Sequence, residues 1–418
     1  MKIELNHLAK TEGHGSFKGS LLEGQIAEAK MLSDEGARLV EGILLGRRFS
    51  DAPVITARIC GICPVVHVLT AAKAMEAAMS VKVSAQTIKM RELLEHAQIV
   101  HSHGLHLFFL SLPDFVNIDN NLRLMKEFPR EAKAAIKVRE FGTKIVKAVG
   151  GRIIHPLAVE VGGFKRLPDK KDLEKILEIY DETLEAAWTV AKVFQKLKFP
   201  EFSRQTDYFS LQTKKDYAVY DGDVVSWGGK KIKPTEFLAH VEELHEMNDA
   251  VKRARWNKKS FMVGALARLH NNSAYLSPEA KKAWKGFGIK LPTWNTTYNV
   301  AAQAVELINS VEKCGEILRE LIKTPFGPAK NHYHAKAGKG VGAVEAPRGT
   351  LYHAYEIDDL GRILNCNIIT PTAQFLNNLE EDLKVFIPEV VGLTDTERDR
   401  RLKILIRAYD PCFSCATH

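Results

Sequence analysis

The segment RICGICPVVH occupies residues 58–67, and the segment DPCFSCATH occupies residues 410–418. Each contains a Cys-x-x-Cys pair, and two such pairs supply four thiolates, a ligand set that zinc or an iron centre accepts. A structural zinc site usually draws both pairs from one small module, whereas nearly the whole chain separates these two. If the pairs act together, the fold must bring both ends of the chain to one point in a large core. The four cysteines are Cys60, Cys63, Cys412 and Cys415.

Two simpler explanations of the cysteine pairs are left open by their spacing. The pairs can be unrelated, or one of them can be a thioredoxin-like disulfide motif. The second explanation predicts a strand–helix–strand context around one pair, and neither pair has it. The chain has six cysteines in 418 residues and no pattern for export, which favours a reducing cytoplasm, where paired thiols more often serve metal or redox chemistry.

The composition is that of an ordinary globular protein, with 45% hydrophobic and 26% charged residues, and it excludes a disordered or fibrous chain. The net charge of +8 is spread over interleaved acids and bases, as in KRLPDKKDLEKILEIYDE at 165–182, which is typical of solvated helix faces. The most apolar stretch, LHLFFLSL at 105–112, is too short to span a membrane and is predicted to be a buried helix. We therefore expect a cytoplasmic protein that neither binds nucleic acid nor crosses a membrane.

Helical periodicity dominates the chain. Strands are predicted in the first thirty residues, between Asp216 and Pro234, and in a hairpin over 349–369 that turns at 358–361. Several long helices imply a bundle core, so the predicted fold is α+β and mainly helical, a long-helix bundle with small peripheral β-hairpins and sheets. The predicted helices cover about 35–45, 66–79, 84–111, 121–149, 172–196, 300–322 and 396–408.

We treat residues 1–418 as a single large domain, with an N-terminal β-rich region at about 1–30 and a peripheral β region at about 205–235. The helix predicted over 84–111 carries four histidines, for which a core or interface role is expected rather than metal binding. These are His96, His101, His103 and His106.

Six motifs, in one order along nearly the whole chain, resemble the signature motifs of nickel–iron hydrogenase large subunits. Two of them are the cysteine segments. The other four contain Glu12-Gly13-His14, Glu41, Glu345-Ala346-Pro347-Arg348-Gly349 and Thr370-Pro371-Thr372. The CGICP and CATH forms look most like the cytoplasmic multimeric group. The resemblance implies the fold of that family, with an active site built from both ends of the chain.

The resemblance also implies an activity, the reversible heterolytic reaction H2 ⇌ 2H⁺ + 2e⁻ at a Ni-Fe(CN)2(CO) centre held by the four cysteines. Cys60 and Cys412 would be terminal ligands of nickel, and Cys63 and Cys415 would bridge nickel to iron. Soft thiolates suit both metals. The proton would leave through Cys412 and then Glu12, because a carboxyl group whose pKa is tuned by burial is suited to proton transfer.

Other matching residues would surround this centre. Arg348 would hang over the metals as a permanent cation. Pro371 and Thr372, together with Ala346 and Pro347, would pack around the diatomic ligands, with the Thr372 hydroxyl as a donor to cyanide.

Two further residues match with a less specific role. Asp114 corresponds, with Asp410, to acids farther from the metals, although its surroundings at 112–115 depart from the commoner pattern. His67 would orient a cysteine or a nearby acid.

A second metal site is implied at the other side of the C-terminal segment. Glu41 and His418, with the backbone carbonyl of Ile368, would bind Mg²⁺ or a similar divalent cation, which prefers oxygen ligands and retained waters. In the family a maturation protease cuts after this histidine once nickel-insertion factors have loaded the site. The end at His418 is thus expected to be a processed end or an encoded stop.

The two remaining cysteines, Cys314 and Cys366, are isolated and cannot build an iron–sulfur cluster. The electrons therefore need a partner, which the resemblance identifies as the hydrogenase small subunit with its iron–sulfur clusters. Further diaphorase or electron-acceptor subunits are expected. They select the acceptor, which can be NAD(P), F420, a heterodisulfide or sulfur, and this chain does not identify it.

Two other functions compete with this interpretation. One is a non-catalytic scaffold subunit whose four-cysteine zinc or iron site joins the two chain ends. The other is a quinone-pocket subunit of a complex-I-like assembly. Members of that branch have generally lost the four cysteines, which are all present here.

Overall fold

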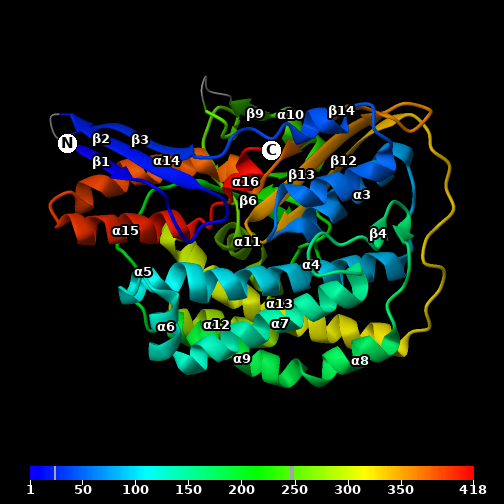
Figure 1. The fold of residues 1–418 in the computed structure, drawn as a ribbon, viewed down its shortest axis with the longest axis horizontal. Coiled ribbons are helices and arrows are strands. Elements are labelled where there is room, and N and C mark those ends of the chain that lie inside the picture. The colour runs from blue at the N-terminus through cyan, green and yellow to red at the C-terminus, as the bar shows by residue number, and fades with distance from the viewer. Residues whose placement is uncertain (23–24, 245–248) are drawn as a thin grey trace.

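The computed structural model describes residues 1–22, 25–244 and 249–418. A layer of long helices lies on one side of the molecule and several small sheets lie on the other, with the C-terminus among the sheets (Figure 1). The prediction of a mainly helical α+β fold is therefore confirmed. No helix within these residues is both long and apolar enough to cross a membrane.

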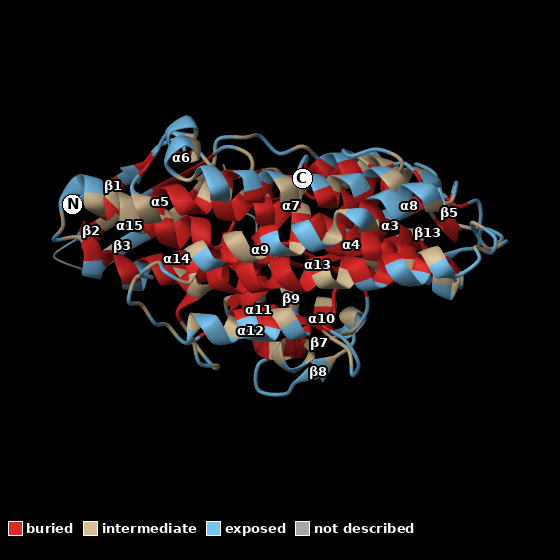
Figure 2. Cartoon of the chain, turned by 90° about the horizontal axis from the view of Figure 1, so that it is seen from below, coloured by how far each residue is buried: buried red, intermediate tan, exposed pale blue. Residues whose placement is uncertain are grey.

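The helical layer is built on α4 (Ala85–Leu105), which packs against α7 (Pro129–Gly150) and α13 (Asn299–Lys323). Ser84 caps the start of α4 by accepting the Thr87 N–H at 3.1 Å. The helix continues through a π-helical turn, His106–Ser111, into α5 (Leu112–Val116). The helix predicted over 84–111 is thus confirmed, and the long helices turn their buried faces inward (Figure 2).

Two segments predicted as single helices are each two helices. The first is α6 (Asn121–Glu127) followed by α7, because Pro129 has no N–H to continue the ladder. The second is α8 (Lys170–Glu178) followed by α9 (Tyr180–Phe194), with the break at Ile179. The helix expected at 35–45 is also shorter than predicted, since α1 covers only Val40–Leu44.

The sheet that matters for the site is antiparallel, in the order β12 (Gly338–Ala346), β13 (Gly349–Ile357), β14 (Ile363–Ile369). It contains the predicted hairpin and packs on α3 (Pro64–Met79). The strand β12 approaches α3 so closely that a Cβ at Gly340 would lie 2.2 Å from the Ala74 carbonyl oxygen, which requires glycine there. This close packing places the end of β12 beside the start of α3.

Four further sheets of the described residues lie around this core, and the C-terminal segment ends beside it (Figure 1). The N-terminal sheet contains β1 (Lys2–Leu5), β2 (Gly15–Leu22) and β3 (Gln25–Ser33). A second sheet has the strand order β11 (Phe261–Met262), β6 (Asp207–Gln212), β7 (Asp223–Ser226), β8 (Lys231–Ile232). The other two sheets are pairs, β9 (Val241–Leu244) with β10 (Arg253–Trp256) and β4 (Val159–Glu160) with β5 (Gly163–Phe164).

The remaining helices connect these layers. They are α2 (Ala52–Thr56), α10 (Pro234–Ala239), α11 (Ala265–Asn272), α12 (Pro278–Phe287), α14 (Pro371–Val390), α15 (Asp395–Ala408) and α16 (Phe413–Ala416), with short 3-10 turns at Phe49–Asp51, Ala57–Ile59, Ser273–Tyr275 and Thr296–Tyr298.

The two ends of the chain meet, as the cysteine spacing requires. The Phe413 N–H donates to the Glu12 carbonyl oxygen at 2.9 Å, so the segment before β2 runs beside the last turn of the protein. The Phe413 ring lies over Gly15, where a Cβ would come within 2.2 Å of it. The first Cys-x-x-Cys turn lies at the N-terminal end of α3, which starts at Pro64, and the second lies at the N-terminal end of α16. The N-terminal ends of the two helices therefore face one site.

Candidate metal centre

The four cysteines form one cluster. Their sulfur atoms lie within 4.8 Å of one another, with 3.7 Å between Cys63 and Cys415 and 3.7 Å between Cys60 and Cys412. All four are buried. Each pair sits at a helix start, where backbone N–H groups point at sulfur. Cys60 Sγ accepts from Cys63 N–H, and Cys412 Sγ accepts from Cys415 N–H, both at 3.3 Å, which favours thiolates.

The four cysteines can all be ionised only if a positive ion lies among them. Burial opposes ionisation of Cys60, but hydrogen bonds from the other three thiols and the charge of Arg348 lower its pKa well below the usual value. Burial raises the pKa of Cys412 well above it. A single thiolate is therefore tolerated alone, whereas four buried thiolates need a positive ion among them.

A small cavity of about 10 Å³, close to the space that one water molecule needs, adjoins Cys63 and Cys415. Arg348 Nη1 is buried there without a hydrogen-bond partner among the described residues. Thr372 Oγ1 accepts the Cys412 N–H at 3.1 Å, which leaves its own hydrogen free to donate. The site thus offers hydrogen-bond donors to small acceptors on a metal held by these sulfurs. The other lining residues are Val66, His67, Ala346, Pro347, Leu351 and Pro371.

Arg348 is fixed by Asp410, the residue that opens the C-terminal segment. Its Nε donates to the Asp410 carbonyl oxygen at 2.6 Å and its Nη2 donates to Asp410 Oδ1 at 2.9 Å. Both residues are buried. The guanidinium therefore keeps one free edge, Nη1, on the cavity side.

A second buried arginine, Arg268 on α11, holds the turn that carries Arg348, and sequence analysis missed it. Its Nε and Nη2 donate to the two carboxylate oxygens of Glu306, each at 2.7 Å. Its Nη1 donates to Glu345 Oε2 at 2.9 Å and to the Ala346 carbonyl at 2.8 Å, and Nη2 donates to the Pro347 carbonyl at 2.9 Å. All five N–H donors of the side chain are used.

Nothing in the sequence around 268 distinguishes this arginine from the many others. The sequence held only an indirect sign of such a residue. If the motif acid Glu345 is buried, it needs a cationic partner somewhere in the chain. Glu306 is itself held by the Tyr217 hydroxyl at 2.5 Å and by His103 Nε2 at 2.9 Å. Burial opposes ionisation of Glu306, yet the Arg268 charge lowers its pKa to about 2.

Glu12 contacts the cluster directly. The Cys412 thiol donates to Glu12 Oε2 at 2.8 Å. Burial, together with the nearby Cys60 thiolate, raises the pKa of Glu12 to about 7. The structure thus brings together the two residues that the sequence motifs paired.

His67 lies on the opposite side of the cluster. Its Nε2 is 3.9 Å from Cys415 Sγ, and its Nδ1 is 3.3 Å from His353 Nε2. His353 Nδ1 in turn lies 2.9 Å from the Tyr355 hydroxyl. Burial lowers the pKa of His67 to about 3, so the imidazole is neutral. His353 and Tyr355, on β13, extend this contact and were not anticipated.

Asp114 lies outside the cluster. Its carboxylate pairs with Arg407, and burial raises its pKa. Arg407 also donates to the Ala9 carbonyl at 2.7 Å. The link from this pair toward the cysteines runs through His106, whose Nε2 donates to the Arg407 carbonyl at 2.9 Å. No contact joins Asp114 to the cavity or to a cysteine within the described residues.

The three groups expected to bind magnesium do converge. His418 Nε2 is 2.8 Å from the Ile368 carbonyl oxygen and 3.8 Å from Glu41 Oε1. The ammonium group of Lys252, which sequence analysis missed, pairs with Glu41 Oε2 and lies 3.4 Å from His418 Nε2. The three groups therefore lie close together, and the Lys252 ammonium supplies one positive charge beside them.

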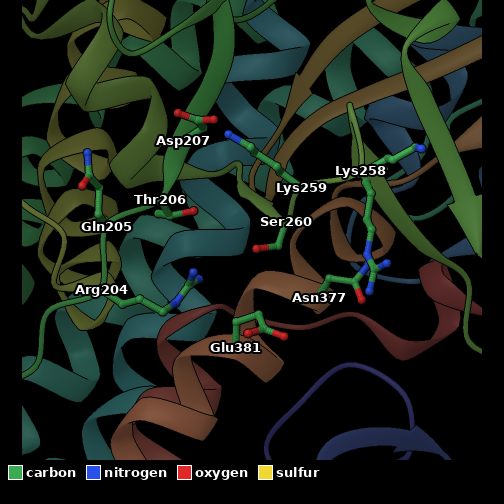
Figure 3. A pocket seen from close by; sticks show the side chains of 10 residues that line it. Arg204, Gln205, Thr206, Asp207, Lys258, Lys259, Ser260, Asn377 and Glu381 are labelled. Carbon is green, nitrogen blue, oxygen red and sulfur yellow. The ribbon is translucent and has the colours of Figure 1, made fainter.

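A more open hollow lies on the surface away from these residues (Figure 3). It is formed by residues 204–207, by Arg255 and the turn at 258–260, and by Asn377 and Glu381 on α14. It contains no cysteine and none of the residues that the sequence motifs indicated.

Comparison with known proteins agrees with this geometry. The model of the nickel-dependent hydrogenase family matches residues 38–165 and 189–418. The alpha chain of sulfhydrogenase 1 from Pyrococcus furiosus is 32% identical over 422 residues, covering 100% of this chain and 98% of the relative. The alpha chain of sulfhydrogenase 2 from the same organism is 30% identical over 423 residues, covering 100% of this chain and 99% of the relative.

Solved structures give the same result. A crystal structure of an NAD⁺-reducing [NiFe]-hydrogenase in the H2-reduced state superposes with a TM-score of 0.89 at 28% sequence identity. The match covers 100% of this chain and 99% of that chain.

Proposed function

The chain belongs to the nickel-dependent hydrogenase family as a catalytic large subunit, and on that premise we propose how its own residues divide the reversible cleavage of H2 into protons and electrons. A nickel–iron centre held by the four cysteines supplies the site at which the H–H bond breaks heterolytically. The protein's tasks are to bind this centre, orient the groups around it, accept the proton and pass the electrons on.

The observation that best supports this proposal is that the cavity adjoins only one of the two cysteine pairs. The cavity lies beside Cys63 and Cys415 and not beside the other pair, so these two cysteines would hold the metal centre on the side where small ligands fit. The donors Arg348 Nη1 and Thr372 Oγ1 would hydrogen-bond to such ligands. Cys60 and Cys412 would hold the centre from the other side. Ala346, Pro347 and Pro371 would help to exclude water from the cavity.

Glu12 is proposed as the proton acceptor for the Cys412 thiol, on the basis of the 2.8 Å contact between them. Geometry of this kind is the first requirement for a general base. The carboxyl group is partly exposed at the edge of the cluster, so it can pass the proton outward.

Arg348 is proposed to act as a fixed cation over the centre, and Arg268 and Asp410 as its positioning residues. Asp410 holds the guanidinium, whereas Arg268 holds the two carbonyls that precede it. His67 is proposed to orient Cys415. Asp114 is assigned, through Arg407, to the stability of the C-terminal segment and not to contact with substrate.

A divalent cation such as magnesium is proposed at Glu41, the Ile368 carbonyl and His418. The donor set of one carboxylate, one carbonyl and one imidazole leaves room for waters, which suits magnesium. The ammonium of Lys252 would have to move from Glu41 to admit the ion. Magnesium analysis of the protein, with and without Glu41, tests this assignment.

The electrons are proposed to leave to a small subunit that carries iron–sulfur clusters. Among the described residues the four-cysteine cluster is the one group of three or more His, Cys, Asp or Glu side chains with metal-binding geometry. Cys314 and Cys366 stand apart from it. Relatives of this chain are named subunits of larger hydrogenases, such as the NAD-reducing hydrogenase HoxS of Cupriavidus necator. We also propose a cytoplasmic location and further acceptor subunits. Because the four sulfurs are buried, we propose that nickel-insertion factors and a maturation protease act when the metals are loaded.

Metal analysis with infrared spectroscopy of the anaerobically purified complex tests the function. We expect equal amounts of nickel and iron in the cluster and absorption from bound cyanide and carbon monoxide, with H2-dependent dye reduction that Cys412→Ala abolishes. Zinc alone would instead support the scaffold function. Absence of these bands together with loss of H2 oxidation would favour the complex-I-like alternative.

A further inference from the structure

The surface hollow of Figure 3 is large enough for a small-molecule ligand. Its volume is about 650 Å³, within the range of about 300–1,000 Å³ that is usual for ligand sites. We name it the basic hollow, and it is lined by residues 204–207, Arg255, residues 258–260, Asn377 and Glu381. None of these residues is aromatic or aliphatic, so a ligand that fits the basic hollow is polar over its whole surface.

Buried side chains of α14 fix the floor of the basic hollow. Arg204 donates through Nε to Asp382, and its Nη2 donates to Asn378 Oδ1 at 2.6 Å. The Thr206 hydroxyl donates to the same Asn378 oxygen at 2.5 Å. Within the part of the chain that the structure describes, Arg204 Nη1 has no hydrogen-bond partner. The floor is therefore held in place by the protein and still offers a donor to a ligand.

Three further cations come from β10 and from the turn that follows it. Arg255, Lys258 and Lys259 are exposed, and none of them forms an ion pair or a side-chain hydrogen bond with residues 1–22, 25–244 or 249–418. The turn is fixed by two backbone hydrogen bonds between Trp256 and Lys259, each 3.0 Å long. The three unpaired cations are thus presented by a short, well-defined segment.

The remaining charged groups of the basic hollow do not cancel these cations. Arg204 is balanced by Asp382. Glu381 is paired with Lys384 at 2.9 Å. Asp207 is the one lining acid without an ion pair in the described ranges of the chain. Three unpaired cations therefore face one unpaired carboxylate, and an excess of positive charge in a hollow attracts anions.

We propose that the basic hollow binds a small compound with two or more phosphate charges, either inorganic pyrophosphate or the phosphate ester of a polyol. Arg255, Lys258 and Lys259 bind the phosphate oxygens through charge-assisted hydrogen bonds. Asp207 accepts hydrogen bonds from hydroxyl groups. This binding site goes beyond the proposed function and does not depend on the metal centre.

Two other occupants fit the lining less well. A nucleotide base needs an aromatic or aliphatic surface to stack on, and the lining has none. An acidic segment of another protein needs apolar or aromatic anchors in pockets, which the lining also lacks. The lining instead matches a compact, hydrophilic anion.

Isothermal titration of the complete enzyme with pyrophosphate and with fructose 1,6-bisphosphate, at about 0.15 M salt, tests the proposal. We expect at least one of them to bind once per chain, with a Kd of about 0.1 mM or lower. Tighter binding of pyrophosphate would identify an inorganic ligand, and tighter binding of the sugar bisphosphate would identify a polyol ester. If neither compound binds, the proposal is wrong.

Charge substitutions locate the binding. Arg255→Gln and Lys259→Gln each remove one charged contact from an exposed side chain, so each should weaken binding about ten-fold while leaving Tm unchanged. The matched control is Lys82→Gln, which removes an exposed charge in the loop between α3 and α4 and should leave the affinity unchanged. Equal weakening in all three variants would show that the anion binds by general charge attraction and would overturn the proposal.

A crosslinking measurement tests whether another chain covers the basic hollow. A benzophenone amino acid is placed at Gln205, an exposed lining residue, in the complete enzyme. We expect no crosslink to any other chain. A crosslink to a second subunit would show that the basic hollow is a protein interface, and the small-anion site would then be wrong.

Discussion

Replacing Arg268 by lysine tests whether the arrangement around Arg348 depends on one buried guanidinium. The arginine uses five donors on four acceptor residues, namely Glu306, Glu345, Ala346 and Pro347. A lysine ammonium has three donors on a single nitrogen. It can neutralise Glu306 or reach the carbonyls before Arg348, but it cannot span both.

The size of the effect follows from the hydrogen bonds that are lost. At least two of the five cannot be replaced, and bonds to charged groups are worth about 1.5–3 kcal/mol each, which gives a loss of about 3–6 kcal/mol in the free energy of unfolding. The larger consequence concerns position. If the carbonyls of Ala346 and Pro347 are released, Arg348 can shift relative to the cavity, and a displacement of about 1 Å can cost about a hundred-fold in rate.

The matched control is Arg91→Lys. Arg91 is also fully buried and also binds one glutamate through both terminal nitrogens, at 2.8 Å and 2.6 Å to Glu76. It contacts neither Ala346 nor Pro347. Both variants should unfold at lower temperature, measured by thermal melting, and both should contain nickel and iron.

Only Arg268→Lys should shift the infrared bands of the bound cyanides and slow H2/D⁺ exchange by about a hundred-fold. The reasoning is refuted if the two variants lose stability but show the same exchange rate and the same bands. It is equally refuted if Arg268→Lys folds with the unmodified exchange rate, since the guanidinium would then have no positioning role.

Three further predictions concern single side chains. Glu12→Gln removes the proton acceptor but preserves shape, so nickel and iron should stay bound while H2/D⁺ exchange falls; full exchange would exclude the relay. Burial lowers the pKa of His96 from 6.5 to about 3, so only the unfolded chain takes up this proton as the pH falls from about 6.5 toward 3, and stability is lost over that window. His96→Gln should therefore flatten the dependence of Tm on pH there, and an unchanged slope would count against neutral burial. Glu41→Gln should remove bound magnesium measured by elemental analysis, and retention of the ion would contradict the ligand assignment.

The sequence predicted the meeting of the chain ends because ligand chemistry is local. A Cys-x-x-Cys turn points two sulfurs at one place, and two such turns at opposite ends of the chain must converge if they share an ion. The start of α3 at Pro64 was also readable, since proline suits a first helical turn. The break before Pro129 had a visible signal too, and the periodic pattern around it concealed the interruption.

Contacts between side chains from distant segments could not be predicted from the sequence in the same way. Hydrophobic periodicity predicts which face of a helix is buried, but not which side chain it meets. Arg268, Lys252 and His353 come from three separate elements and reach the site only through the packing of the sheets on the helices. For the same reason Asp114 could be placed near a motif by its neighbours in sequence, although its carboxylate turns to Arg407.

The C-terminal segment is fixed by contacts from three other parts of the chain. The segment that carries Cys412 and Cys415 is short, and buried thiolates repel one another until a cation joins them. It is held by Arg38, by the Phe413 ring over Gly15 and by His418 against Ile368. These contacts fix the positions of Cys412 and Cys415 relative to the first cysteine pair.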